Sequence, residues 1–311
     1  MPLYLGVDTS NYATSAALYD PETSFVQMKK QFLPVKPGAL GLQQSEAVFL
    51  HTKQLPLLLE ELLREAGELI GIGVSTRPRC AAGSYMPCFL AGEAAARAAA
   101  AAAHCRVYPF SHQQGHVAAA LYSSGRMELF QRRFLVFHVS GGTTEALLAE
   151  PGKEDILRLT PVARSLDLKA GQAIDRVGVM LGFPFPAGAE VDKLALSFDQ
   201  AIKVRPSMKG ADCSLSGVEN QCRKLLAEGA PPARVARHCM ESVLAALRGM
   251  AYALKEQYGD IPLVFAGGVM SSRVLRGALE TEFEAGFAEP QFSSDNAFGT
   301  ALLASIKANE S

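Results

Sequence analysis

Two stretches of the chain share one hydrophobic pattern, an apolar strand followed by a small polar turn and a second strand. The first covers residues 3–10 and continues at 14–19, and the second covers 134–144 and continues at 145–148. Each pattern predicts a β-hairpin. Small turn residues let backbone N–H groups approach an anion closely, which suits phosphate binding. The repeat predicts an α/β protein of two lobes with an actin-like nucleotide-binding fold.

The remaining apolar pattern predicts helices and strands around these hairpins. Leucines at helical spacing predict a helix over residues 44–65, and a strand follows at 69–75. Ser111 is a suitable N-cap for a helix ending near residue 122. The other predicted elements are helices at 91–103, 171–181, 233–258 and 297–309, and strands at 106–109 and 263–266.

The chain of 311 residues is long enough for two hydrophobic cores. We place the N-terminal lobe at residues 1–120 plus 297–311, because the last helix is expected to pack back on the first lobe. The C-terminal lobe then covers 121–296, and nucleotide and metal are expected in the cleft between the lobes.

Composition narrows the class of protein. Apolar residues make up 49% and charged residues 20%, as in a soluble globular protein. The net charge of −1 gives no global basic field of the kind that binds nucleic acid. Six cysteines without a CxxC pair, and no apparent secretory signal, predict reduced thiols in the cytoplasm. No apolar run is suited to span a membrane, so no membrane association is expected.

A histidine pair is the first candidate for chemistry. His112 and His116 are four residues apart in a predicted helix, so both imidazoles can point to one place. Two imidazoles and a carboxylate, for which Asp295 is the candidate, suit a first-row divalent metal. Taken alone, a histidine pair at this spacing is more often part of a surface or a core.

Further motifs, in order along nearly the whole chain, carry a resemblance. They include Gly-Val-Asp-Thr-Ser at 6–10, Val-Ser-Gly-Gly-Thr-Thr at 139–144, Ala-Gly-Gln-Ala-Ile-Asp-Arg-Val at 170–177, Leu-Gly-Phe-Pro-Phe-Pro-Ala-Gly at 181–188, Val-Asp-Lys-Leu-Ala at 191–195, Ser-Leu-Ser-Gly at 214–217, Ala-Gly-Gly-Val at 266–269 and Ser-Asp-Asn at 294–296. With the histidine pair, they resemble the tRNA threonylcarbamoyl-transferase family, formerly called O-sialoglycoprotein endopeptidase or glycoprotease. The resemblance implies the sugar kinase/Hsp70/actin (ASKHA) fold with duplicated RNase H-like domains.

The resemblance also implies a metal site. The family's ligands correspond to His112, His116 and Asp295. His138 falls where archaeal and eukaryotic members carry a tyrosine near the metal, so it is either a further ligand or an inward strand residue. One divalent metal is expected, with Fe or Zn favoured by the histidines and Mg or Mn possible together with nucleotide.

An adenine nucleotide, either ATP or an acyl-adenylate, is the second cofactor that the resemblance implies. Asp192 corresponds to the family's ribose-contacting aspartate, and Ser272 takes the place of an asparagine in a nearby turn. Asp8 and Asp167 are the candidate catalytic carboxylates. The remaining positions that match the family's nucleotide site are Ser140, Gly141, Gly142, Thr143 and Thr144 at the phosphates, Gly171 and Gly188 at the nucleoside, and Gly267 and Gly268 at the adenine.

Several positions depart from the family pattern. Tyr12 and Ala13 replace an acidic pair, Leu168 replaces the second of two aspartates, and Gln172 replaces a glutamate. Thr143, Thr144, Glu145 and Ser272 also differ, and residues 77–83 replace a Gly-Pro-Gly-rich turn. Metal ligands and phosphate-binding residues survive while others change. The pattern predicts a diverged paralogue that accepts another acyl or carbamoyl group, or another acceptor.

Four functions fit these observations to different degrees. The favoured one is metal-dependent transfer of a threonylcarbamoyl or related carbamoyl-type group from an adenylate to N6 of a tRNA adenosine. A nucleotide-binding scaffold that dimerises with a catalytic partner is the alternative. A metallopeptidase lacks support because Gln113, not glutamate, follows His112. A sugar-type kinase leaves the histidines unexplained. The expected partners are tRNA and either a partner protein or a second copy of the chain.

Overall fold

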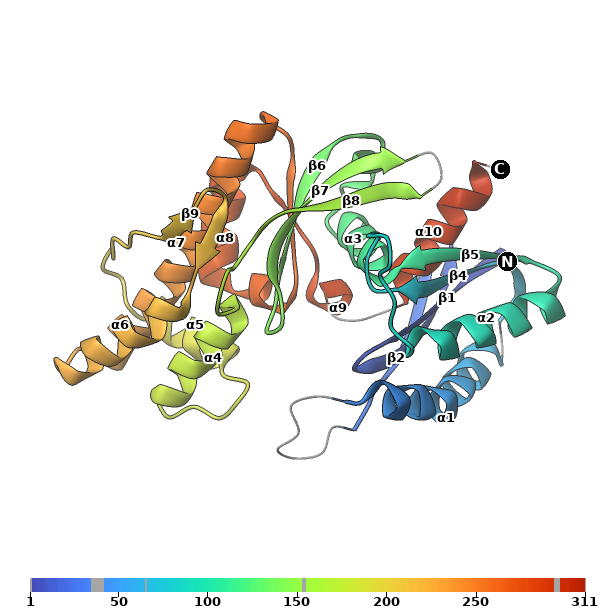
Figure 1. The fold of residues 1–311 in the computed structure, drawn as a ribbon, viewed down its shortest axis with the longest axis horizontal. Coiled ribbons are helices and arrows are strands. Elements are labelled where there is room, and N and C mark those ends of the chain that lie inside the picture. The colour runs from blue at the N-terminus through green and yellow to red at the C-terminus, as the bar shows by residue number, and fades with distance from the viewer. Residues whose placement is uncertain (1, 35–41, 65, 153–154, 294–296, 311) are drawn as a thin grey trace. The chain divides into compact units, whose positions relative to one another are not determined.

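The computed structural model describes residues 2–34, 42–64, 66–152, 155–293 and 297–310 (Figure 1). The chain divides into two compact units. Unit 1 contains Met1–Tyr122, Pro151–Leu159 and Gln291–Ser311, and unit 2 contains Ser123–Glu150 and Thr160–Pro290. The lobe boundaries given above, and the placement of ligands between the lobes, stay predictions.

A five-stranded mixed sheet forms the centre of unit 1. Its strands are β1 (Pro2–Ser10), β2 (Ala13–Asp20), β3 (Phe25–Phe32), β4 (Glu68–Arg77) and β5 (Arg106–Ser111), in the order β3-β2-β1-β4-β5. β1 and β2 pair antiparallel, as the first hairpin prediction requires, whereas β4 runs parallel to both β1 and β5.

A second five-stranded sheet, mostly in unit 2, repeats this arrangement. Its strands are β6 (Phe134–Val139), β7 (Thr144–Gly152), β8 (Ile156–Arg164), β11 (Leu263–Ala266) and β12 (Gly286–Phe287), in the order β12-β11-β6-β7-β8. The end of β7 and the start of β8 fall within Pro151–Leu159, which is assigned to unit 1. β6 and β7 form the second predicted hairpin, and β11 runs parallel to β6 and β12. When the second sheet is read from its β8 edge, the order β8-β7-β6-β11-β12 corresponds strand for strand to β3-β2-β1-β4-β5 of the first sheet. The duplication suggested by the two hairpins is therefore confirmed.

The helices α1 (Gln44–Leu63), α2 (Phe89–Ala103) and α10 (Phe298–Asn309) pack on the first sheet, and α3 (His112–Ser123) packs against α10. Figure 1 shows α1 and α2 side by side, and their buried residues share one core with the sheet. Successive side chains of a strand point to opposite faces. Odd-numbered residues of β1 face α2 and even-numbered residues face α10, as the close contacts of Gly92 and Gly6 show. Asp8 therefore lies on the α10 face.

On the α10 face of the sheet, glycines let the backbones of the strands, α10 and α3 come into direct contact. A Cβ on Gly6 would lie 2.0 Å from the carbonyl oxygen of Ala297, and one on Gly73 would lie 1.9 Å from that of Thr300. A Cβ on Gly299 would lie 1.8 Å from the carbonyl oxygen of Gly115. No side chain fits at these three positions without a backbone shift. The sheet, α10 and α3 are thus held at fixed separations.

The second sheet is covered by α4 (Ala170–Met180), α5 (Gly188–Leu196), α6 (Ser216–Ala227), α7 (Pro232–Tyr258) and α8 (Arg273–Phe283). Their apolar faces form one core with the strands. The remaining elements are β9 (Ser207–Lys209), β10 (Asp212–Ser214), α9 (Pro290–Ser293) and the short 3-10 helices Met127–Gln131 and Gly268–Ser271. The six cysteines are free thiols. No helix within the described ranges has the length and apolar content to cross a membrane.

Candidate active site

The start of α3 is fixed by a reciprocal cap. The backbone N–H of Gln114 donates to the Ser111 hydroxyl at 3.2 Å, and the backbone N–H of Ser111 donates to Oε1 of Gln114 at 2.7 Å. This is a capping box, and it confirms Ser111 as the predicted N-cap. Nε2 of Gln114 also donates to the carbonyl oxygens of Asp155 and Leu157, each at 2.9 Å. The first turn of α3, which carries the histidine pair, is thereby held rigidly.

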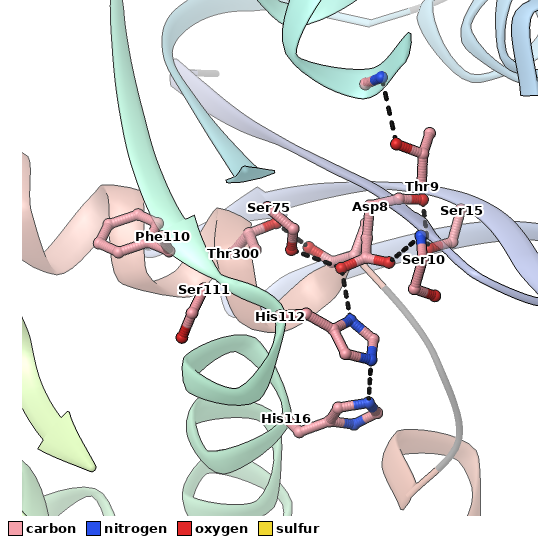
Figure 2. A network of polar contacts seen from close by, with 12 residues as sticks. Asp8, Thr9, Ser10, Ser15, Ser75, Phe110, Ser111, His112, His116 and Thr300 are labelled. Atoms are coloured by element: carbon pink, nitrogen blue, oxygen red, sulfur yellow. Dashed lines mark hydrogen bonds and ion pairs between the residues drawn. The ribbon is translucent and has the colours of Figure 1, made fainter. Parts of the chain in front are cut away.

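His112 and His116 bring their Nε2 atoms into hydrogen-bond contact with each other (Figure 2). The two Nε2 atoms are 2.9 Å apart, and the rings are nearly perpendicular, at 81°. The helical spacing brings the imidazoles together as predicted. Whether they bind metal stays a prediction.

Asp8 orients the first of these imidazoles. The side chain is buried at the end of β1, and Oδ2 lies 2.7 Å from Nδ1 of His112. Oδ2 also accepts from the Ser75 hydroxyl, and Oδ1 accepts from the backbone N–H of Ser10 at 3.0 Å. Because an ionised carboxylate only accepts hydrogen bonds, we assign the proton of His112 to Nδ1. Nε2 of His112 then keeps a lone pair directed toward His116.

This donor set fits a divalent transition metal. Neutral imidazole nitrogens are ligands that Zn and Fe favour, and a carboxylate on the far ring nitrogen is the usual support of a metal-binding histidine. No group of three or more His, Cys, Asp or Glu side chains suited to a metal occurs among the described residues. The predicted third ligand, Asp295, lies outside them. His138 belongs to β6 of unit 2, in register with Glu145 and Ala266, and its role as a ligand stays a prediction.

The predicted phosphate-binding turn joins β6 to β7. The backbone N–H of Ser140 donates to the carbonyl oxygen of Thr143 at 2.8 Å, and the Ser140 hydroxyl accepts from the N–H of Thr143 at 3.1 Å. Thr144 Oγ1 accepts from the backbone N–H of Ala170 at 2.8 Å, so the turn is attached to the start of α4. A Cβ on Gly171 would lie 2.7 Å from Cα of Gly141. Glycine is needed there for the turn and the helix to touch.

A cavity of about 570 Å³ lies in unit 2, within the range of ligand pockets. Six predicted nucleotide-site residues line it, namely Gly141, Gly171, Gly188, Asp192, Gly268 and Ser272. The sequence reasoning missed others that line it, including Asp175, Lys193 and Arg273. The structure thus brings Ser272 and one residue from each of five separate motifs to one cavity, while Ser140, Gly142, Thr143, Thr144 and Gly267 are not among its lining residues.

Asp192 and Ser272 contact each other inside this cavity. The Ser272 hydroxyl donates to Asp192 and accepts from the backbone N–H of Leu275 at 3.1 Å, which makes Ser272 the N-cap of α8. Asp192 also accepts from the backbone N–H groups of Arg273 and Val274, at 3.1 and 3.3 Å. The carboxylate therefore anchors the N-terminus of α8, and its contact with ribose stays a prediction.

Gly267 needs to be glycine for two reasons. Its φ of +100° lies in the region that favours glycine. A Cβ at this position would also lie 2.3 Å from the carbonyl oxygen of Val139. The turn after β11 is therefore pressed against the end of β6. Neighbouring Gly268 lines the cavity and has open space where a side chain would begin.

Asp167, the second candidate catalytic carboxylate, binds the start of α6. Oδ1 accepts from the backbone N–H of Leu215 at 2.7 Å, and Oδ2 accepts from the Ser216 hydroxyl at 2.6 Å. The N–H of Leu168 also donates to Oδ1, at 2.6 Å. Desolvation by partial burial raises the pKa of Asp167, but these hydrogen bonds outweigh it and lower the pKa below its usual range. The ionised carboxylate is thus held as a helix anchor, and its catalytic role stays a prediction.

Asp167→Ala is expected to lower the free energy of unfolding by about 1 kcal/mol at pH 7, because helix α6 loses its cap. A carboxyl with a lowered folded-state pKa stabilises the fold above its unfolded pKa of about 3.9, and this contribution disappears as the pH falls through the folded pKa. Denaturant unfolding should show a smaller deficit at pH 3 than at pH 7. Asp199→Ala, at an exposed residue, is the control. An equal deficit at both pH values would contradict the assignment.

Three residues around the histidine pair and the end of β1 were not predicted, namely Gln114, Ser75 and His51. Gln114 was visible in principle, because Ser-x-x-Gln before an apolar run is the signature of a capping box. Ser75 and the buried His51 gave no local signal, since their contacts join β4 and α1 to the end of β1. Such pairings across the sheet depend on the tertiary fold.

Comparison with known proteins identifies the family. The TsaD family model, described as tRNA N6-adenosine threonylcarbamoyltransferase, matches residues 38–302. A curated relative of that name from a strain of Thermus thermophilus is 30% identical over 307 residues, covering 96% of this chain and 91% of the relative. One from Pyrobaculum neutrophilum is 28% identical over 283 residues, covering 89% and 79%.

Solved structures with lower identity show the fold. A full-length HypF in the phosphate- and nucleotide-bound form matches with a TM-score of 0.58 and 13% identity, over 99% of this chain and 55% of that one. Component A of the (R)-2-hydroxyglutaryl-CoA dehydratase of Acidaminococcus fermentans gives 0.55 and 15%, over 99% and 100%. A ROK family glucokinase from Streptomyces griseus gives 0.51 and 12%, over 98% and 99%. The predicted ASKHA fold is confirmed.

The family model spans most of the chain, and the relative from Thermus is 30% identical over nearly its full length. The resemblance inferred from scattered motifs is thereby confirmed. The chain belongs to the tRNA N6-adenosine threonylcarbamoyltransferase family, whose activity is the transfer of a threonylcarbamoyl group to N6 of a tRNA adenosine.

Proposed function

We propose that this chain transfers the threonylcarbamoyl group from an adenylate, with a divalent metal at His112 and His116 and the nucleoside in the cavity of unit 2. The observation that carries the proposal is the buried Asp8 beside Nδ1 of His112. It leaves the Nε2 atom of His112 beside that of His116, at 2.9 Å, where a metal would replace the hydrogen bond between them. Fe or Zn is the proposed metal, because both ligands in the described part are imidazoles.

The reaction exchanges one bond to the carbamoyl carbon for another. The N6 amine of adenosine attacks the carbamoyl carbon of the adenylate, and a C–N bond forms. The C–O bond to phosphate breaks, AMP leaves with the electron pair of that bond, and N6 releases a proton to solvent. A bound divalent metal supplies Lewis-acid stabilisation of negative charge on oxygen. The residues of the chain contribute orientation: Asp8 fixes the tautomer of His112, and the cavity of unit 2 positions the nucleoside.

The glycines of the cavity support the nucleotide proposal. Gly188 and Gly268 line the cavity, and a Cβ at either would meet nothing within 4 Å. Their backbones are therefore accessible to a ligand, and glycine is not required there for packing. A ligand that approaches the backbone closely is the physical reason for a glycine at such a position.

Gly268→Val is expected to weaken adenine-nucleotide binding by about tenfold or more, because the branched side chain occupies ligand space. The melting temperature without ligand should change little. Isothermal titration calorimetry with AMP and thermal unfolding would measure both. Gly217→Val in α6, which does not line the cavity, is the matched control. Unchanged nucleotide affinity in Gly268→Val would contradict the placement of the nucleoside.

The test of the proposed function is direct. The purified metal-loaded chain is incubated with unmodified tRNA and threonylcarbamoyl-adenylate, and the nucleosides of the digested tRNA are separated and identified by mass. Threonylcarbamoyladenosine is the expected product. Parallel reactions with other carbamoyl-adenylates test whether the changed positions, such as Gln172 and Leu168, redirect the acyl group.

A protein partner or a homodimer is also proposed, and the same assay should be run with and without candidate partners. The curated relative from Halobacterium salinarum is described as a probable bifunctional tRNA threonylcarbamoyladenosine biosynthesis protein, and this chain covers 54% of it. Product formed only with a partner would support assembly. Absence of product under every condition would contradict the proposed function.

A further inference from the structure

A buried hydroxyl near the histidine pair has no hydrogen-bond partner. Ser10, the last residue of β1, is 4% exposed, and its Oγ is the one buried side-chain N or O atom in the described part of the chain that lacks a partner. Buried polar groups are nearly always paired, because an unpaired one costs folding free energy. Such an atom near a reaction centre points to a ligand that pairs with it.

The backbone of Ser10 is held on both sides. Its N–H donates to Oδ1 of Asp8 at 3.0 Å, and its carbonyl oxygen lies 2.9 Å from Nε2 of His51. His51 is itself fully buried, with Nδ1 2.7 Å from the Thr14 hydroxyl. Since both backbone groups are engaged, the position of the Ser10 Cβ atom is fixed. The hydroxyl that it carries is left without a partner.

The same carboxylate that holds Ser10 also orients the metal-site imidazole. Oδ1 of Asp8 takes the N–H of Ser10, and Oδ2 lies 2.7 Å from Nδ1 of His112. In Figure 2, the Ser10 hydroxyl points to the side of the Asp8 carboxylate where the His112 ring lies. One carboxylate thus holds both the backbone of Ser10 and the imidazole of His112.

We propose that the Ser10 hydroxyl binds the substrate by donating a hydrogen bond to an oxygen of the acyl-adenylate, in its phosphate or its threonylcarbamoyl group. This inference rests on the proposed function. An adenylate offers phosphate and carbonyl oxygens as acceptors, and a hydrogen bond to a charged oxygen is stronger than one between neutral groups. Substrate binding then satisfies the only described buried side-chain atom that the fold leaves unpaired.

Ser10→Ala tests the proposal because a binding role and a structural role predict opposite changes. Removing an unpaired buried hydroxyl should leave the ligand-free melting temperature unchanged or raise it by about 2 °C. Affinity for threonylcarbamoyl-adenylate, measured by calorimetry on the metal-loaded full chain, should fall by about tenfold. Ser305→Ala is the control, since that buried hydroxyl donates to the carbonyl oxygen of Leu302 at 2.8 Å. It should lower the melting temperature and leave affinity unchanged.

Binding of AMP and of threonylcarbamoyl-adenylate together shows whether the Ser10 hydroxyl bonds to a phosphate oxygen or to an oxygen of the threonylcarbamoyl group. Weaker binding of both AMP and threonylcarbamoyl-adenylate places the hydrogen bond on phosphate, and weaker binding of the acyl-adenylate alone places it on the threonylcarbamoyl group. A melting temperature below wild type, or unchanged affinity for both ligands, would overturn the proposal, as would a wild-type chain that binds neither. A wild-type chain that binds the acyl-adenylate without transferring its acyl group would refute the proposed function. The difference in ligand affinity between wild type and Ser10→Ala would still test the role of Ser10 in binding.

Discussion

His112→Ala is expected to remove the bound divalent metal and to lower kcat/KM for threonylcarbamoyl transfer by at least about 10²-fold. The substitution deletes one of the two Nε2 atoms that meet at 2.9 Å and leaves the buried Asp8 without its imidazole partner. Lewis-acid stabilisation worth several kcal/mol is lost with the metal. Metal content by plasma mass spectrometry and the rate of tRNA modification give the two readouts on one preparation.

The control for this experiment is His104→Asn. His104 is exposed at the C-cap of α2 with a φ of 54°, a conformation that asparagine also tolerates. It should keep metal and activity at the wild-type level. A His112→Ala protein that retains both a full equivalent of metal and wild-type turnover would exclude the proposed site. Loss of activity with retained metal would assign His112 a role other than ligation.

The sequence predicts the repeated elements well because their signals are local. Both hairpins, the helices that contain leucine or alanine stripes, and the Ser111 cap follow from spacing within a few residues. β3 was not predicted, since its mostly polar and largely exposed residues carry no clear alternation. The helix α5 was also missed, because it is short and follows a turn rich in proline and glycine. Edge strands and short helices acquire their structure from neighbours.

The sequence predicts many of the residues that belong to the site, but not which of them contact each other. The family resemblance supplied Asp192 and Ser272 separately, yet only the fold shows that they bond to each other at the start of α8. Asp8 and His112 are separated by 104 positions, so no spacing rule links them. Asp167 emerged as a candidate catalytic residue, whereas its hydrogen bonds make it an anchor for α6. Tertiary contacts therefore decide which carboxylates are held in hydrogen bonds to other parts of the chain.

Gly299→Ala is expected to lower the free energy of unfolding by about 3 kcal/mol, the upper end of ordinary overpacking effects. The added Cβ would lie 1.8 Å from the carbonyl oxygen of Gly115, a backbone atom that cannot rotate away. Gly115 lies between His112 and His116 on α3, so relief of the clash by separation of α10 and α3 shifts the turn that carries the histidine pair relative to α10. Metal affinity should therefore fall together with stability.

Denaturant unfolding and metal titration of the same samples measure the two effects. Gly277→Ala is the matched control, because this glycine lies within α8 and a Cβ there meets nothing within 4 Å. That substitution should stabilise the protein by about 0.5–1 kcal/mol, since alanine loses less backbone entropy on folding. Equal stability of Gly299→Ala and wild type would show that α10 and α3 can separate freely. Reduced stability with unchanged metal affinity would show that the position of the histidine pair does not depend on the contact between Gly115 and Gly299.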